Sequence, residues 1–313
     1  MGNTKSMHFM KSYSSEKKRR YSKMRTSYPK ISIVIPVAND HLIVRCIKSV
    51  DMGDAEIVVV LNGASLEFDQ YIQNLQERDK RIVIYRLPYR GIGAARELGC
   101  QKAKGEYLIM MDSDCEFEQD CIKKLVTGLK NVDFSKGDVI YRANSFETKL
   151  VAKARGTHSS SVQNVYTPLL AFKKSVIDKI GGYYFSTKIP WTEDHELAQR
   201  VVRRNLRVAV IASAIGYHKP TTIKNDLSSA FNYGIGYNIG IRSNLTRPSF
   251  LYGGAHSLIA SLFYDLYRTT RIPHYIKSIS QEFGILTALY MTLWMCVFSF
   301  GYYLGYLEGG GKQ

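Results

Sequence analysis

Two carboxylates, Asp112 and Asp114, follow an apolar run and are the residues of this sequence best suited to chemistry. The run from Glu106 to Met111 comes after Gly105 and is typical of a buried strand. Ligands of open parallel sheets bind at the carboxyl ends of the strands. Paired carboxylates there can hold Mg²⁺ or Mn²⁺, hard cations that often share oxygen ligands with a substrate diphosphate. We therefore expect a metal-dependent enzyme for a nucleotide-activated substrate, although Asp-x-Asp also occurs in ordinary surface turns.

The elements before these acids alternate between strand and helix patterns. Strand patterns occur at 31–35, 56–61 and 81–86, and helix patterns at 41–50, 66–76 and 91–104. This alternation predicts βαβ units with a parallel sheet. Right-handed crossovers would place the strand ends at one edge of that sheet, together with the two carboxylates.

Beyond Asp114 the patterns are weaker. We expect strands at 139–142, 169–172 and 208–211, and helices at 173–180 and 192–204. Gly181-Gly182 would end the first of these helices as a C-cap. Thr192 would be the N-cap of the second, whose early acids Glu193 and Asp194 suit the positive end of the helix dipole. Residues 150–160 show no clear pattern and are expected to form a mobile loop.

The C-terminal part is strongly apolar. Residues 284–306 carry no charge and exceed the roughly 20 residues that cross a bilayer core, which predicts a transmembrane helix. The shorter stretch 250–267 contains Asp265 and fits an interfacial or re-entrant helix better. Arg268, Arg271 and Lys277 lie between them and favour a catalytic part on the cytosolic face. We expect three regions: a flexible basic arm at 1–30, a catalytic domain at 31–220 and a membrane-associated helical region at 221–313.

Composition supports a folded chain with an unusual arm. The 313 residues are 45% hydrophobic and 22% charged, which excludes a disordered protein. The net charge is +16, and residues 1–30 hold nine Lys or Arg against Glu16 alone. Such an arm binds nucleic acid or an anionic membrane, or is simply a solvated tail. The five cysteines are odd in number and form no Cys-x-x-Cys pair, which indicates reduced thiols rather than disulfides or a zinc site.

Several short motifs together resemble the inverting family 2 glycosyltransferases of the GT-A fold over residues 31–218. They are Pro36-Val37-Ala38-Asn39-Asp40, Asn62-Gly63-Ala64-Ser65, the helix start from Gly91 to Gly99, Asp112-Ser113-Asp114, Gly181-Gly182 and Glu193-Asp194. The chain departs from the family pattern at Asp40, Asn62 and Glu97, where Glu, Asp and Asn are usual. The resemblance implies an α/β fold with a Rossmann-like, mixed and mostly parallel sheet flanked by helices, followed here by C-terminal membrane-associated helices.

The resemblance also implies a nucleotide-sugar site at the strand ends. Its residues would be Pro36, Val37, Asn39, Asp40, Asn62, Gly91, Arg96, Asp112, Ser113 and Trp191. Asn62 stands where an Asp commonly accepts a hydrogen bond from uracil, so UDP- and GDP-sugars both stay open. Arg96 would face the sugar diphosphate, brace Asp112, or lie solvated on its helix. Trp191 would stack on a sugar or anchor the core.

A metal and a base complete the implied site. Asp114 would ligate Mn²⁺ or Mg²⁺, Asp112 would contact the ribose or a metal-bound water, and His218 is a candidate third ligand or else an ordinary strand-end histidine. Asp194, beside Glu193, is the candidate general base for inversion, because one carboxylate must take the proton of the acceptor hydroxyl. The alternative is that these two acids only satisfy amides at the helix N-terminus.

The sequence thus predicts a membrane-attached glycosyltransferase with a lipid-linked or surface-glycan acceptor. The segment Phe231–Tyr237 lacks the Gln-x-x-Arg-Trp element of processive synthases, so we expect single additions. A close variant is transfer to polyprenyl phosphate itself. Two alternatives belong to other classes of protein. One is a basic protein that binds nucleic acid or membranes, although the sequence contains no nucleic-acid-binding motif. The other is an inactive scaffold of the same fold. We expect no nucleic-acid partner.

Overall fold

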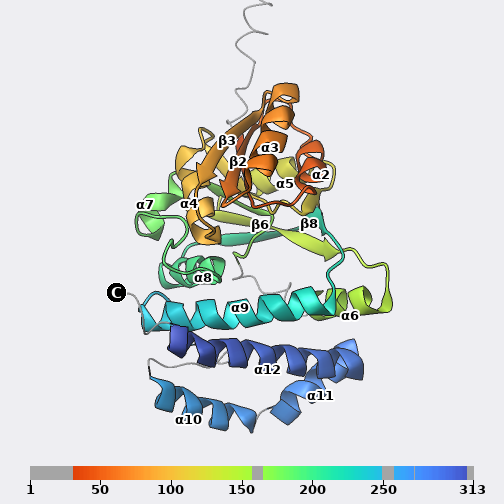
Figure 1. Cartoon of the computed structure of the whole chain (residues 1–313), viewed down its shortest axis with the longest axis vertical. Coiled ribbons are helices and arrows are strands. Elements are labelled where there is room, and N and C mark those ends of the chain that lie inside the picture. Colours follow the sequence, from red (N-terminus) through yellow and green to blue (C-terminus); the bar gives the residue numbers. More distant parts are fainter. Residues whose placement is uncertain (1–30, 157–164, 249–256, 271, 309–313) are drawn as a thin grey trace, which may run out of the picture.

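The computed structural model describes residues 31–156, 165–248, 257–270 and 272–308 (Figure 1). The predicted arm at 1–30 and the start of the 250–267 stretch lie outside them. The strands are β1 (Ile31–Val37), β2 (Glu56–Asn62), β3 (Ile82–Leu87), β4 (Tyr107–Met110), β5 (Cys115–Phe117), β6 (Phe134–Tyr141), β7 (Leu170–Lys173) and β8 (Val208–His218). The helices are α2 (Ile43–Lys48), α3 (Leu66–Arg78), α4 (Ile92–Lys102), α5 (Cys121–Gly128), α6 (Phe146–Gly156), α7 (Val176–Ile180), α8 (Glu193–Arg203), α9 (Ile223–Arg242), α10 (Leu258–Thr269), α11 (Ile272–Phe283) and α12 (Ile285–Glu308).

The strands form one mixed sheet in the order β3-β2-β1-β4-β7-β6-β8-β5. The first four are parallel, β7 is antiparallel to both β4 and β6, β8 is parallel to β6, and β5 is antiparallel to β8. The predicted α/β fold, with a mixed and mostly parallel sheet flanked by helices, is confirmed. Two strands are longer than predicted, because β6 begins before residue 139 and β8 continues to His218. In both extensions buried residues stand among half-buried or exposed ones, so their apolar runs are short.

Helices cover both faces of the parallel part of the sheet. One face of β1 and β2, with Ile33 and Val59, packs in a cluster with residues of α2, α3 and α5. The opposite face, with Val34 and Val58, packs with residues of α4, α7 and α8. Burial on both sides explains why these strands read as continuous apolar runs. All five cysteines are free thiols, as predicted.

Residues 146–156 form a helix, which corrects the expected mobile loop over 150–160. Val151 and Ala154 of α6 are fully buried in a cluster with Tyr290 and Met291 of α12. The helix is therefore stabilised by a partner more than 130 residues away in the sequence, and local periodicity could not reveal it. Residues 157–164 lie outside the described part of the chain.

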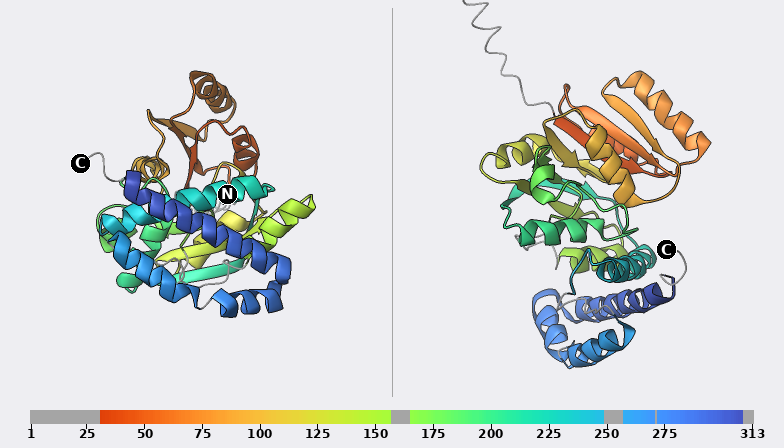
Figure 2. Two further views of the ribbon diagram at one scale, coloured as in Figure 1. Left: turned by 60° about the horizontal axis from the view of Figure 1, so that its bottom comes forward. Right: turned by 90° about the vertical axis from the view of Figure 1, so that its left-hand side faces the viewer.

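The C-terminal helices stack as layers beneath the sheet (Figures 1 and 2). Helix α9 lies below the α/β part, α12 runs alongside α9, and α10 and α11 form the outermost layer. Glycines allow α9 and α12 to touch backbone to backbone: a Cβ on Gly234 would lie 2.0 Å from the Phe298 carbonyl oxygen, and one on Gly301 would lie 2.1 Å from that of Phe231. The two helices thus form one tightly packed unit.

Among the described residues, one helix, within Ile285–Tyr306 of α12, is long and apolar enough to cross a membrane. The structure adds that one side of this helix is buried, with Trp294, Phe298 and Tyr302 packed against α9. The opposite side, with Leu289 and Leu293, is exposed. Helix α12 is therefore apolar on all sides, but one of its faces is packed against α9 and the opposite face is exposed.

Candidate functional site

The predicted site residues gather where β1, β2 and β4 end. Asp112, Ser113 and Asp114 follow β4 and are half-buried, and β1 lies between β4 and β2 in the sheet. Pro36 and Val37 end β1 as buried residues. This common edge is where open α/β sheets bind ligands.

Two amide side chains tie the loops at this edge together. Asn39 accepts a hydrogen bond from the Ser65 amide at 3.0 Å, and Asn62 Oδ1 accepts one from the Gly91 amide at 2.7 Å. Gly63 between them has a φ of +59°, and a Cβ there would lie 2.9 Å from the Arg90 nitrogen. The amide oxygen of Asn62 therefore fixes the start of α4 in this structure, at the place where the resemblance implies base recognition.

Arg96 joins the Asp-x-Asp motif to the acids of α8. Its Nη2 donates to Asp112 Oδ1 at 2.8 Å, and its Nη1 pairs with Glu193 Oε1. Arg96 is buried, so the solvated alternative is wrong and its contact is with Asp112. The close approach of α4 depends on Gly93, where a Cβ would lie 2.2 Å from the Ser186 carbonyl oxygen. One guanidinium thus fixes two carboxylates from distant parts of the chain.

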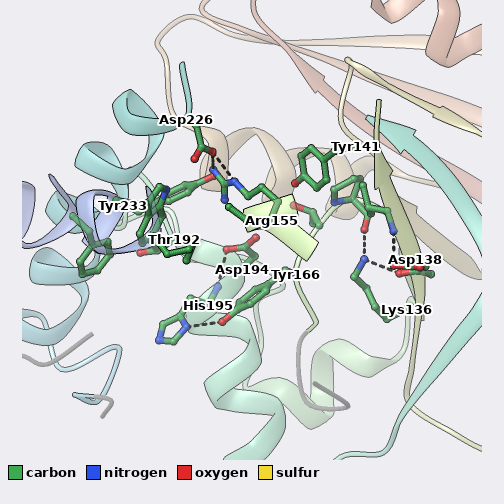
Figure 3. Close-up of a pocket in the computed structure, with 18 of the residues that line it drawn as sticks. Lys136, Asp138, Tyr141, Arg155, Tyr166, Thr192, Asp194, His195, Asp226 and Tyr233 are labelled. Carbon is green, nitrogen blue, oxygen red and sulfur yellow. Dashed lines mark hydrogen bonds and ion pairs between the residues drawn. The ribbon is translucent and has the colours of Figure 1, made fainter. Parts of the chain in front are cut away.

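Asp194 is the acid of this group that lines a cavity (Figure 3). Its Oδ1 accepts a hydrogen bond from the His195 amide at 2.8 Å. Burial raises the pKa of Asp194, and the nearby positive charge of Arg96 only partly opposes this. The neighbouring His195 has its pKa lowered to about 4 by burial, so it is neutral near pH 7. Asp194 is therefore an acid poised to take up a proton.

Thr192 begins α8 as predicted, but its side chain does not cap the helix. Its φ is +64°, a left-handed conformation that is strained for a β-branched residue. Within the described part of the chain, its Oγ1 is buried without a hydrogen-bond partner. Trp191 before it is 39% exposed and is not a core anchor.

Asp114, Cys115 and His218 form a group whose ligand atoms lie within 4.8 Å of one another. The pairing of β5 with β8 places Cys115 opposite His218 and so brings the histidine to the acid. His218 Nδ1 lies 2.8 Å from the Lys219 carbonyl oxygen, which can only accept, so Nδ1 carries the hydrogen. In the neutral ring, the Nε2 lone pair then faces Asp114 Oδ2 at 3.5 Å. Two acceptors that face each other fit a cation held between them.

Cys115 is the weakest of these three candidate ligands. Burial, together with the charges of Asp112 and Asp114, holds its pKa well above the usual value, so the thiol stays protonated. The remaining carboxylate and imidazole suit Mn²⁺ or Mg²⁺ supplemented by phosphate oxygens. The donor set therefore fits the expected metal.

Lys219 is a residue of this site that the sequence did not single out. Its ammonium lies 3.2 Å from Asp114 Oδ2 and 3.1 Å from Asp40 Oδ2. It thereby links the loop after β1 to the Asp-x-Asp motif. Its only signal in the sequence is its position after His218.

Glu97, one of the departures from the family pattern, has a structural role. Its Oε2 accepts hydrogen bonds from the amides of Tyr184 and Phe185 at 2.8 and 2.9 Å. The segment that it holds leads to Trp191 and α8. The longer acid therefore supports the backbone that precedes the candidate base.

The cavity beside Asp194 has a volume of about 240 Å³ and lies between the α/β part and the C-terminal helices. Sequence reasoning missed most of its lining, because the residues come from six separate elements. They include Lys136, Asp138, Tyr141, Arg155, Tyr166, His195, Asp226, Tyr233, Met291, Trp294 and Phe298 (Figure 3). A chemical group seated here would meet the candidate base directly.

Comparison with known proteins shows that this chain is similar to glycosyltransferases of one family. The model of the family described as "Glycosyl transferase family 2" matches residues 32–179. A Haemophilus influenzae protein described as an uncharacterized glycosyltransferase is 30% identical over 102 residues, which are 31% of this chain and 40% of that protein.

Two relatives have more specific descriptions. The glucosyl-dolichyl phosphate glucuronosyltransferase of Haloferax volcanii is 27% identical over 146 residues, 42% of this chain and 47% of that protein. The GalNAc(5)-diNAcBac-PP-undecaprenol beta-1,3-glucosyltransferase of Campylobacter jejuni is 30% identical over 104 residues, 31% and 34% of the two chains. This chain thus spans less than half the length of these curated relatives.

A solved structure extends the likeness of fold beyond the matched segment. The crystal structure of S. aureus TarS 1–349 superimposes with a TM-score of 0.50 at 14% identity, covering 91% of this chain and 93% of that one. At this identity the likeness concerns the fold alone.

Proposed function

We propose that this chain is an inverting, metal-dependent enzyme of glycosyl transferase family 2, the family whose model matches residues 32–179. It would transfer a sugar from a UDP- or GDP-sugar to a lipid-linked or cell-surface glycan. The observation that carries this proposal is the ion-pair cluster in which Arg96 joins Asp112 to Glu193, beside Asp194 at the cavity. This cluster supports the proposal because Arg96 links Asp112, the acid assigned to the donor side, to Glu193, the neighbour of the candidate base Asp194.

The roles of the residues follow from their positions. Asp112, fixed by Arg96, faces the ribose side, and Asp114 with His218 would hold Mn²⁺ or Mg²⁺. When bound, the metal would neutralise charge on the diphosphate. Asp194 accepts the proton of the acceptor hydroxyl while the oxygen of that hydroxyl forms a bond to the anomeric carbon. The bond from that carbon to the diphosphate oxygen breaks, and its electron pair leaves with the nucleoside diphosphate.

The raised pKa of Asp194 predicts the pH dependence of activity. A base must be unprotonated, so kcat/KM should fall as the pH drops through the pKa of Asp194, which burial raises above the ordinary Asp value of 3.8. Replacing Arg96 by Gln removes the charge that favours the ionised acid, so the acid limb should move to higher pH. Profiles of kcat/KM against pH measure the acid limb of the wild type and its shift in Arg96→Gln. Unfolding is followed at each pH so that loss of structure is not mistaken for protonation of the base. An acid limb at or below pH 3.8 would contradict the role of Asp194.

The names of two relatives support a lipid-linked acceptor, since both describe substrates built on a polyprenyl or dolichyl carrier. Transfer to polyprenyl phosphate itself is the variant of this proposal. The apolar helices next to the cavity support either, because a lipid-linked acceptor is met at a membrane.

Membrane attachment is the next part of the proposal. Exposed apolar side chains of α10 and α12 form what we call the outer apolar surface: Leu258, Ile259, Leu262, Phe263, Leu266, Ile285, Leu286, Leu289, Leu293 and Phe300. The cations of segment 268–277, which runs from the end of α10 into α11, favour the cytosolic leaflet. The catalytic part would then face the cytosol.

We expect the protein to bind vesicles of phosphatidylcholine and phosphatidylglycerol in sedimentation assays. The double change Leu289→Glu and Leu293→Glu should weaken binding, because it places two charges on the outer apolar surface. Leu66→Glu is the matched control, since Leu66 is 89% exposed on α3 and distant from that surface. Equal loss of binding in both variants, or none in either, would contradict membrane attachment through this surface.

The decisive experiment for the enzyme is a donor screen. Purified protein with Mn²⁺ is incubated with a panel of UDP- and GDP-sugars, and release of the nucleoside diphosphate is measured. We expect one donor class to be hydrolysed slowly in the absence of acceptor. No turnover or binding of any nucleotide sugar would overturn the proposed function.

A further inference from the structure

We infer that α9 and α12 complete the acceptor site of this enzyme, and that its occupant is a neutral saccharide that reacts through a hydroxyl group rather than a phosphate. This inference rests on the proposed function. It goes further because both helices lie beyond the family-matched segment 32–179 and because it separates the two acceptor classes.

The cavity places Asp194 opposite the C-terminal helices. Helix α9 contributes Asp226, Tyr233 and Tyr237 to the lining, and α12 contributes Met291, Trp294 and Phe298. The two helices are held in place by their glycine contacts and by α6, whose Arg155 forms an ion pair with Asp226. The wall opposite the candidate base is therefore fixed.

The charges of the lining disfavour a phosphate. Three carboxylates, of Asp138, Asp194 and Asp226, line the cavity against the two cations Lys136 and Arg155. Both cations are already engaged. The carboxylate of Asp226, which also accepts a hydrogen bond from Tyr290 at 2.6 Å, neutralises Arg155.

Lys136 is held by backbone oxygens. It donates to the carbonyls of Gly137 and Pro168 at 2.9 and 2.8 Å, and burial lowers its pKa to about 8. A phosphate would enter next to three acids with no uncommitted cation among the described lining residues. That arrangement costs Coulomb energy in a partly buried site.

The same lining suits a sugar. Tyr233 and Trp294 both line the cavity, and the guanidinium carbon of Arg155 lies 5.9 and 5.8 Å from their ring centroids. They give an aromatic wall that can pack against the apolar face of a saccharide ring. Thr192 Oγ1 is buried without a partner among the described residues, and a sugar hydroxyl would satisfy it. A hydroxyl acceptor must lose a proton when it reacts, and the carboxylate of Asp194 can take that proton. An ionised phosphate can react without the help of a base.

The first test compares acceptor classes with the donor that the screen identifies. Octyl glycosides of several hexoses and N-acetylhexosamines are compared with undecaprenyl monophosphate, and the products are separated by mass. Transfer to a glycoside hydroxyl is the expected result. Transfer to the polyprenyl phosphate but to no glycoside would overturn the inference. Lack of any donor hydrolysis would instead contradict the proposed function itself.

The second test addresses the wall. Trp294→Ala and Thr192→Val should each raise the acceptor KM about tenfold, which corresponds to ~1.4 kcal/mol, with the donor KM nearly unchanged. Cys296→Ala is the matched control, because Cys296 is two residues away on α12, is exposed and does not line the cavity. If Trp294→Ala does not fold, Thr192→Val still tests the site without a large change in volume. Unchanged acceptor KM in the folded variants would overturn the inference.

Discussion

Replacing Asp194 by asparagine is expected to lower kcat about 10²- to 10⁴-fold, the usual contribution of a general base. Asparagine has nearly the shape of the acid and keeps an oxygen to accept the His195 amide hydrogen. It cannot take a proton from the acceptor. Initial rates with saturating donor and acceptor measure the loss, and the donor KM should change little.

This substitution also separates catalysis from helix capping. If Asp194 only satisfied an amide at the start of α8, asparagine would do the same and activity would persist. Asp178→Asn is the control, because Asp178 lies exposed in the first turn of α7. Wild-type kcat in Asp194→Asn would remove this residue from the mechanism and leave Glu193 or Asp112 to be tested as the base.

The sequence could predict the part of the site that β1, β2 and β4 position. These strands are buried on both faces, so their apolar runs are visible without knowledge of the fold, and the polar residues after them mark the edge of the sheet. The motifs Asn39-Asp40, Asn62-Gly63 and Asp112-Ser113-Asp114 therefore fall together. Their shared edge is a consequence of parallel pairing rather than of any one motif.

The cavity could not be predicted in this way. Arg155 reaches Asp226 from α6 across 71 residues, and Trp294 joins them from α12. No local periodicity encodes such partners, and α6 was mistaken for a loop for the same reason. The role of Lys219 depends likewise on the pairing of β5 with β8, which brings it to Asp114.

Helix α12 shows why composition alone describes a helix incompletely. A charge-free stretch of this length predicts a membrane span, yet the packed face of α12 contributes three residues to the cavity beside Asp194. Only the exposed face of α12 is available to contact lipid. The same apolar sequence therefore serves two surfaces, and a substitution on each, at Trp294 and at Leu293, should affect different measurements.

The second large effect is expected at the metal group. Asp114→Asn should lower kcat/KM about 100-fold or more, because a bound metal contributes several kcal/mol to stabilising the leaving diphosphate. The apparent affinity for Mn²⁺, measured from the dependence of activity on the metal, should fall with it, since the group of Asp114, Cys115 and His218 loses its carboxylate. Chelation with EDTA should abolish wild-type activity, and Mn²⁺ or Mg²⁺ should restore it.

Asp120→Asn is the matched control for this change. Asp120 is exposed, lies six residues further along the chain and has a φ of +59°, a conformation that asparagine tolerates as well as aspartate. In Asp114→Asn the ammonium of Lys219 keeps its pair with Asp40, so the loop after β1 stays attached and donor binding can be measured separately. Wild-type metal dependence in Asp114→Asn would place the cation elsewhere. Full activity in EDTA would show that Lys219 and Arg96 alone supply the positive charge that the diphosphate requires.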